Sequence, residues 1–187
     1  MGSRTKFPWY SLVFNAVYSA YYLTFGVFTT SWWLLTLGLY YFLLSIVRFV
    51  VLRNLPKTRF VMRFTGYMLM ALVVPLVGTV ILSVIQDRGR EYHMIVMIGI
   101  ATYAFTKITL STINLIRSRH NHSGKLAALR NISFADGLVS IFALQRSMLV
   151  SFEGMTGSEI CLMNTLTGSA VCLTVFYLGY FLVIDRQ

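Results

Sequence analysis

Two oppositely charged residues, Lys107 and Asp136, lie deep inside long apolar segments of the sequence. Charge in such surroundings is costly, so each side chain needs a partner or a purpose. The two apolar segments that hold these residues follow one another in the chain. Counted from the connection between the segments, Asp136 lies about ten residues into the second and Lys107 about nine residues into the first. At a helical rise of about 1.5 Å per residue, both would be roughly 15 Å deep. We therefore expect Lys107 and Asp136 to pair between adjacent antiparallel helices.

Three interpretations of this pair are open. In the first, it is a buried ion pair that fixes the register of two helices. In the second, it carries a proton- or cation-coupled step in which Asp136 changes its charge against Lys107. In the third, Asp136 faces an unrelated polar cavity.

Uncharged polar residues within the apolar segments could extend the site. They could act as hydrogen-bond partners between helices, or line a small hydrated path, and the sequence does not choose between these roles. The candidates are Asn15, Thr36, Tyr40, Tyr41, Asn114, Asn131, Ser140 and Gln145.

Two arginines lie nearer the segment ends. Arg48 is within a turn of one end, and we expect its guanidinium to reach out to the polar interface. Arg146 is near the opposite edge, where pairing with Glu153 or Glu159 in the following loop is the simplest expectation.

The composition defines the elements that must position these residues. Apolar residues make up 57% of the 187 residues and charged residues 12%, against about 25% charged in a typical soluble domain. A bilayer core needs roughly 20 apolar residues per helix. The sequence predicts an all-α integral membrane protein, a single domain over 1–187. Its six transmembrane helices are expected near 9–28, 32–51, 64–85, 94–116, 126–150 and 160–184.

Basic residues predict the orientation. They gather before the first predicted helix, between the second and third, around the fourth-to-fifth connection and at the end of the chain. The positive-inside rule then places both termini in the cytoplasm. The formal charge of +10 indicates contact with anionic lipid at that face. Nucleic-acid binding is not expected, because the charges are divided among separate segments next to the membrane.

A spacing repeats in the two halves of the chain. Ser31 precedes Leu44 by thirteen positions, and Ser123 precedes Asp136 by the same number. Two three-helix halves with an odd number of spans would be inverted relative to one another, and transporters built this way often bind substrate between the halves. The match of two serines is equally compatible with chance.

The first half of the chain has Asn15, Gly26 and Ser31, and the second half has Ser123, Ala128, Asp136 and Ser140. The types and spacing of these residues resemble the transmembrane domain of the cation diffusion facilitators, loosely over the whole chain. The resemblance implies six spans with cytoplasmic ends, a homodimer and transport of a divalent cation.

The chain departs from that family at the metal site. The resemblance implies two pairs of His or Asp ligands, and this chain has Tyr40 and Leu44 for one pair, Ile132 and Asp136 for the other. Asp136 is the sole ligand-like position retained, whereas zinc needs three or four ligands. The family's cytoplasmic C-terminal domain is not expected either, so the chain resembles a degenerate relative.

The function expected from the sequence is that of a small transporter-like protein, with a cation or proton path past Asp136 and Lys107. The alternative is a non-transporting scaffold that binds lipid or a membrane partner. No motif indicates an enzyme or a cofactor. A divalent cation enters only through the resemblance. A short basic N-terminus suits a bacterial inner membrane.

Overall fold

The structure of the protein is a computed structural model. It describes residues 7–53, 58–85, 94–118, 124–151 and 155–184. These residues form six α-helices and no strand. The helices are α1 (Phe7–Phe28), α2 (Trp32–Arg53), α3 (Thr58–Ile85), α4 (Met94–Ser118), α5 (Gly124–Ser151) and α6 (Gly157–Ile184). Each coincides with a predicted segment. The largest difference is at α3, which begins at Thr58 where the sequence predicts a start near 64.

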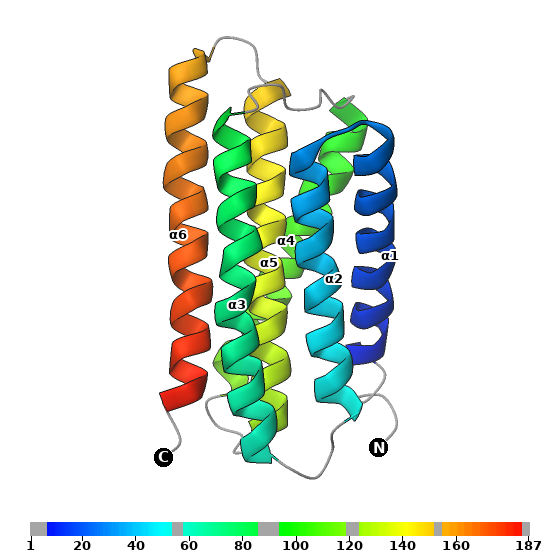
Figure 1. Cartoon of the computed structure of the whole chain (residues 1–187), viewed down its shortest axis with the longest axis vertical. Coiled ribbons are helices and arrows are strands. Elements are labelled where there is room, and N and C mark those ends of the chain that lie inside the picture. The colour runs from blue at the N-terminus through cyan, green and yellow to red at the C-terminus, as the bar shows by residue number, and fades with distance from the viewer. Residues whose placement is uncertain (1–6, 54–57, 86–93, 119–123, 152–154, 185–187) are drawn as a thin grey trace.

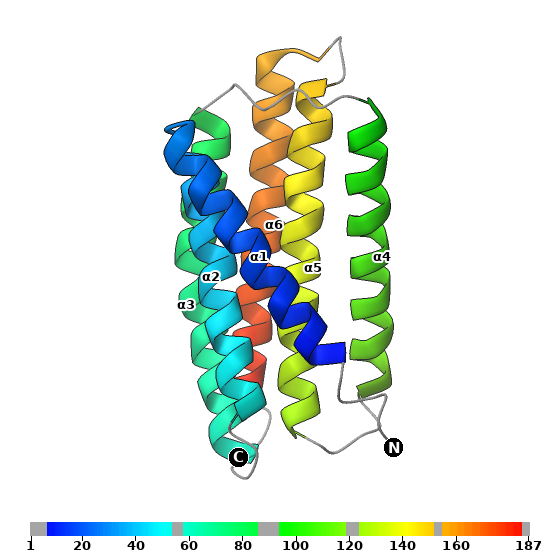
Figure 2. The ribbon, with the colours of Figure 1, turned by 90° about the vertical axis from the view of Figure 1, so that its right-hand side faces the viewer.

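The helices form one elongated bundle (Figure 1). We call the end at which α1, α3 and α5 begin the near end, and the opposite end the far end. α2, α3, α5 and α6 pack around a common core, with α1 packed along α2 and α4 along α5. Figure 2 shows α1 inclined against the other helices and α4 at the edge of the bundle.

Four stretches of the described residues are long and apolar enough to cross a membrane. They are Trp32–Arg53, Phe60–Ile85, Leu126–Leu149 and Gly157–Ile184. One face of α2 supplies much of the core, with Leu37, Tyr40 and Leu44 fully buried at the three- and four-residue spacing of one helix face. Large apolar side chains on the outside of the bundle, such as Phe42 and Leu173, remain exposed. This outside-apolar pattern fits a multi-pass membrane protein.

The turn between α1 and α2 is held by a paired set of backbone hydrogen bonds. The amide of Ser31 donates to the carbonyl of Gly26 at 3.0 Å, and the amide of Thr30 donates to that of Val27 at 3.3 Å. This Schellman pattern requires a left-handed residue after the helix, and Thr30 takes that place with φ of 50°. A β-branched residue is strained there.

Thr30→Gly is therefore expected to raise the free energy of unfolding by about 1 kcal/mol, because glycine adopts this backbone conformation without strain. Denaturation of the purified protein in detergent micelles would measure the gain. Thr29→Gly is the matched control and is not expected to stabilise. An unchanged or lower stability of the Thr30 variant would contradict the strain.

Candidate functional site: a buried charge cluster around Asp136

Asp136 of α5 is fully buried within the bundle. The ammonium of Lys107, on α4, donates to its Oδ1 at 2.7 Å. The predicted pair is therefore present, between adjacent antiparallel helices. The Lys107 side chain keeps 15% of its surface exposed, against 1% for that of Asp136.

The second carboxylate oxygen of Asp136 meets the first half of the chain. Asn15 of α1 donates its amide to Oδ2 at 3.0 Å. Arg48 of α2 brings a guanidinium nitrogen within 3.8 Å of the same oxygen and donates to Ser133 of α5 at 3.1 Å. Four helices, α1, α2, α4 and α5, thus supply the side chains around one carboxylate.

The expectation that Arg48 reaches the polar interface is wrong. Arg48 is only 1% exposed, and its guanidinium points into the bundle toward Asp136 and Ser133. A long basic side chain near a helix end can extend either way. A carboxylate within reach in the core decides the direction here.

Ser140 and Tyr41 complete the surroundings of Lys107. The ammonium also donates to Ser140 Oγ at 3.0 Å, and this hydroxyl donates to the backbone carbonyl of Asp136 at 2.8 Å. The Tyr41 hydroxyl is 3.4 Å from Ser140 Oγ. The Lys107 nitrogen also stands 5.7 Å from the centre of the Tyr41 ring, within cation–π range.

Two predicted site residues do not join this network. Tyr40 is fully buried beside Tyr41, but its hydroxyl makes no hydrogen bond to any residue that the structure describes. Asn131 donates its amide to the carbonyl of Ala127 on its own helix at 2.9 Å. Short amide side chains often bond locally in this way.

The remaining polar candidates lie elsewhere. Thr36 donates to backbone carbonyls of its own helix, and Gln145 donates to the carbonyl of Met163 on α6 at 3.4 Å. The side chain of Asn114 lies outside the described residues. The polar set of the sequence therefore divides, and Asn15, Tyr41 and Ser140 are the members that reach the Lys107–Asp136 pair.

The cluster brings two cationic side chains to one carboxylate. Both carboxylate oxygens of Asp136 already have partners, Lys107 at Oδ1 and Asn15 with Arg48 at Oδ2. Among the described residues, no group of three or more His, Cys, Asp or Glu comes together. This arrangement suits a change of ion-pair partner at Asp136, or protonation and deprotonation of its carboxylate, better than coordination of a divalent metal.

Arg146 forms a second buried cationic site toward the far end. Its guanidinium carbon lies 4.2 Å from the centre of the Trp33 ring of α2, and the residue is 4% exposed. Arg146 is thus buried between helices, five residues before the last residue of α5, Ser151. The carboxylate of Glu159 accepts two hydrogen bonds from Thr156 at the start of α6, and Glu153 lies outside the described residues.

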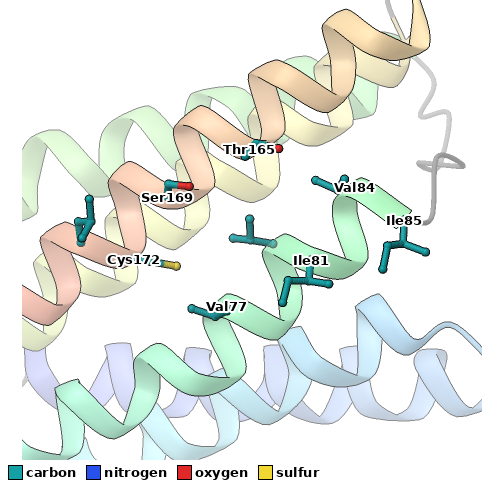
Figure 3. Close-up of a pocket in the computed structure, with 9 residues that line it drawn as sticks. Val77, Ile81, Val84, Ile85, Thr165, Ser169 and Cys172 are labelled. Carbon is teal, nitrogen blue, oxygen red and sulfur yellow. The ribbon is translucent and has the colours of Figure 1, made fainter.

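A groove between α3 and α6 is separate from both sites (Figure 3). It has a volume of about 530 Å³, and its walls are largely apolar. None of the residues around Asp136 contributes to it. Its lining consists of Val77, Val80, Ile81, Val84 and Ile85 of α3 with Thr165, Ser169, Cys172 and Leu173 of α6.

Fold and site together define a helical bundle that fits a multi-pass membrane protein with a charged cluster in its interior. Comparisons of the chain with protein-family models, curated proteins and solved structures find no match.

Proposed function

We propose that the protein is a small transporter-like membrane protein in which a proton or a cation passes Asp136. The observation that carries this proposal is the convergence of four helices on one fully buried carboxylate. Ionisable side chains at membrane depth are expensive and usually mark a transport or relay site. The charges of Lys107 and Arg48 oppose binding of a divalent cation, which makes a proton the better cargo.

In this proposal all six helices cross the membrane as two inverted halves, with both termini in the cytoplasm. The packing supports the repeat: α1 packs on α2 as α4 packs on α5, and α3 pairs with α6 across the halves. α1 and α4 run in opposite directions (Figures 1 and 2). Asp136 receives contacts from both halves, and sites between inverted repeats are common in transporters.

The resemblance to cation diffusion facilitators enters as part of the proposal. Leu44 and Ile132, which stand at two of the family's ligand positions, are fully buried apolar residues. Lys107 is bonded to the retained carboxylate. These contacts support a relative that has lost the central metal site and kept the helical frame. A homodimer, a bacterial inner membrane and binding of anionic lipid at the basic near end complete the proposal.

A second candidate is a non-transporting scaffold that binds lipid or a membrane partner. The observation that favours it is the complete burial of Asp136 with a short, direct bond to Lys107. A sealed ion pair fixes helix register without any moving ion.

Proton flux into purified proteoliposomes tests the choice. We expect wild-type flux to be lost in Asp136→Asn and partly retained in Asp136→Glu, which keeps the carboxylate. The matched control is Glu159→Gln, an acid-to-amide change at the exposed start of α6, and its flux should equal that of the wild type. Size-exclusion profiles would confirm that each variant is folded. Folded wild-type protein without flux of protons or metal ions would contradict transport and leave the scaffold.

A further inference from the structure

Two buried arginines join α2 to α5 on opposite sides of Asp136. On the near side, Arg48 of α2 donates to Ser133 of α5 at 3.1 Å, one helical turn before Asp136. On the far side, Arg146 of α5 stacks on Trp33 of α2 at 4.2 Å. Arg146 follows Asp136 by ten residues, which is about 15 Å along the helix.

The Trp33–Arg146 contact lies at the far end of the interface between α2 and α5. Both residues are buried, at 9% and 4% exposure, and a cation–π contact away from water is among the stronger of its kind. α2 and α5 otherwise pack less extensively than either packs with its neighbour along the chain. The Trp33–Arg146 contact therefore belongs to the limited set of contacts that join these two helices.

Two buried polar groups of α2, one at that contact and one nearer the middle of the helix, have no hydrogen-bond partner among the described residues. Trp33 and Tyr40 are seven residues apart, two turns along the same helix face. The indole N–H of Trp33 and the hydroxyl of Tyr40 are buried and have no hydrogen-bond partner among the described residues. Buried donors are normally satisfied by protein or water. Water that enters between α2 and α5 would satisfy both. Tyr40 packs against Tyr41. The Tyr41 hydroxyl is 3.4 Å from the Ser140 Oγ that donates to the backbone carbonyl of Asp136.

We infer that Trp33 and Arg146 form a gate at the far end of the α2–α5 interface. Its opening admits water past Tyr40 to Asp136. The inference rests on the proposed function in one respect, since it assigns the far side as one access route of the transport site. The gate itself is measurable without any transport.

Cysteine labelling in sealed membrane vesicles tests the gate. In a Cys161→Ser, Cys172→Ala background, Leu37→Cys places one thiol on the buried face of α2, one turn below Trp33. With the gate intact, a charged, membrane-impermeant thiol reagent should label it slowly. Adding Arg146→Leu or Trp33→Leu should accelerate labelling by at least about tenfold. Trp33→Phe keeps an aromatic ring and should remain slow.

Matched controls give the side and the specificity. Thr29→Cys, in the exposed α1–α2 turn, reports which vesicle face carries the far end, and the acceleration at Leu37→Cys should occur from that face only. Arg48→Leu, at the other end of the interface, should not accelerate labelling from the far face.

Slow labelling in folded Arg146→Leu and Trp33→Leu proteins, or acceleration from both faces equally, would overturn the gate. Wild-type protein without flux, but with accelerated labelling in the two gate variants, would reject transport and keep the gate. Flux with unaltered labelling would reject the gate and keep transport.

Discussion

Asp136→Asn is expected to lower the free energy of unfolding by about 3–5 kcal/mol, the range for breaking a buried ion pair from one side. The substitution leaves the guanidinium of Arg48 and the ammonium of Lys107 close together without their carboxylate. Unfolding of the purified protein in mixed detergent micelles would measure the loss.

Lys107→Met is expected to cost less, about 1.5–3 kcal/mol, the value of a hydrogen bond to a charged group. Asp136 would keep its contacts with Arg48 and Asn15. The double variant should lose less stability than the sum of the two single losses. The difference should be about 0.5–3 kcal/mol, because the two side chains are in direct contact. A larger loss of unfolding free energy for Lys107→Met than for Asp136→Asn would contradict the assignment of Asp136 as the centre of the charge cluster.

Asn164→Leu is the matched control for these changes. Asn164 is 1% exposed, and its amide has no hydrogen-bond partner among the residues that the structure describes. Replacing a buried polar group that makes no bond with an apolar one of similar size removes no favourable contact. We therefore expect the stability to stay equal or to rise.

The helices could be predicted from apolar run length, and the matching level of Lys107 and Asp136 on neighbouring helices from residue counting alone. Both depend on local geometry: a helix has a fixed rise, and adjacent antiparallel helices put equal depths side by side. The early start of α3 could not be predicted this way. Arg59 and Arg63 interrupt the apolar run, but the helix continues through them, because hydropathy reports the span and not the end of the helix.

The contacts made by individual polar residues depended on helix rotation, which the sequence does not specify. Tyr40 and Tyr41 are neighbours with the same hydroxyl, but only Tyr41 reaches Ser140. The direction of Arg48 and the stacking of Arg146 on Trp33 both require α2 to lie against α5. Hydropathy alone contains no signal for that pairing.

A close backbone approach between α3 and α6 gives the second large effect. A Cβ placed on Gly66 of α3 would lie 2.7 Å from the carbonyl oxygen of Gly179 on α6, and one on Gly179 would lie 2.8 Å from that of Gly66. No ordinary Cβ contact is so short, and backbone atoms cannot turn away as a side chain can. α3 and α6 approach this closely because both positions lack a side chain, a common device where membrane helices meet.

Gly66→Ala and Gly179→Ala are each expected to lower the free energy of unfolding by about 1–3 kcal/mol, the usual cost of overpacking. Gly78→Ala on the same helix is the control, since its added Cβ would meet nothing nearer than Thr36 at 4.0 Å. There the better helix propensity of alanine should leave stability unchanged or raise it by up to about 1 kcal/mol. Unfolding in mixed micelles would rank the three variants. Equal stability of Gly66→Ala and Gly78→Ala would mean that α3 and α6 do not touch through these glycines.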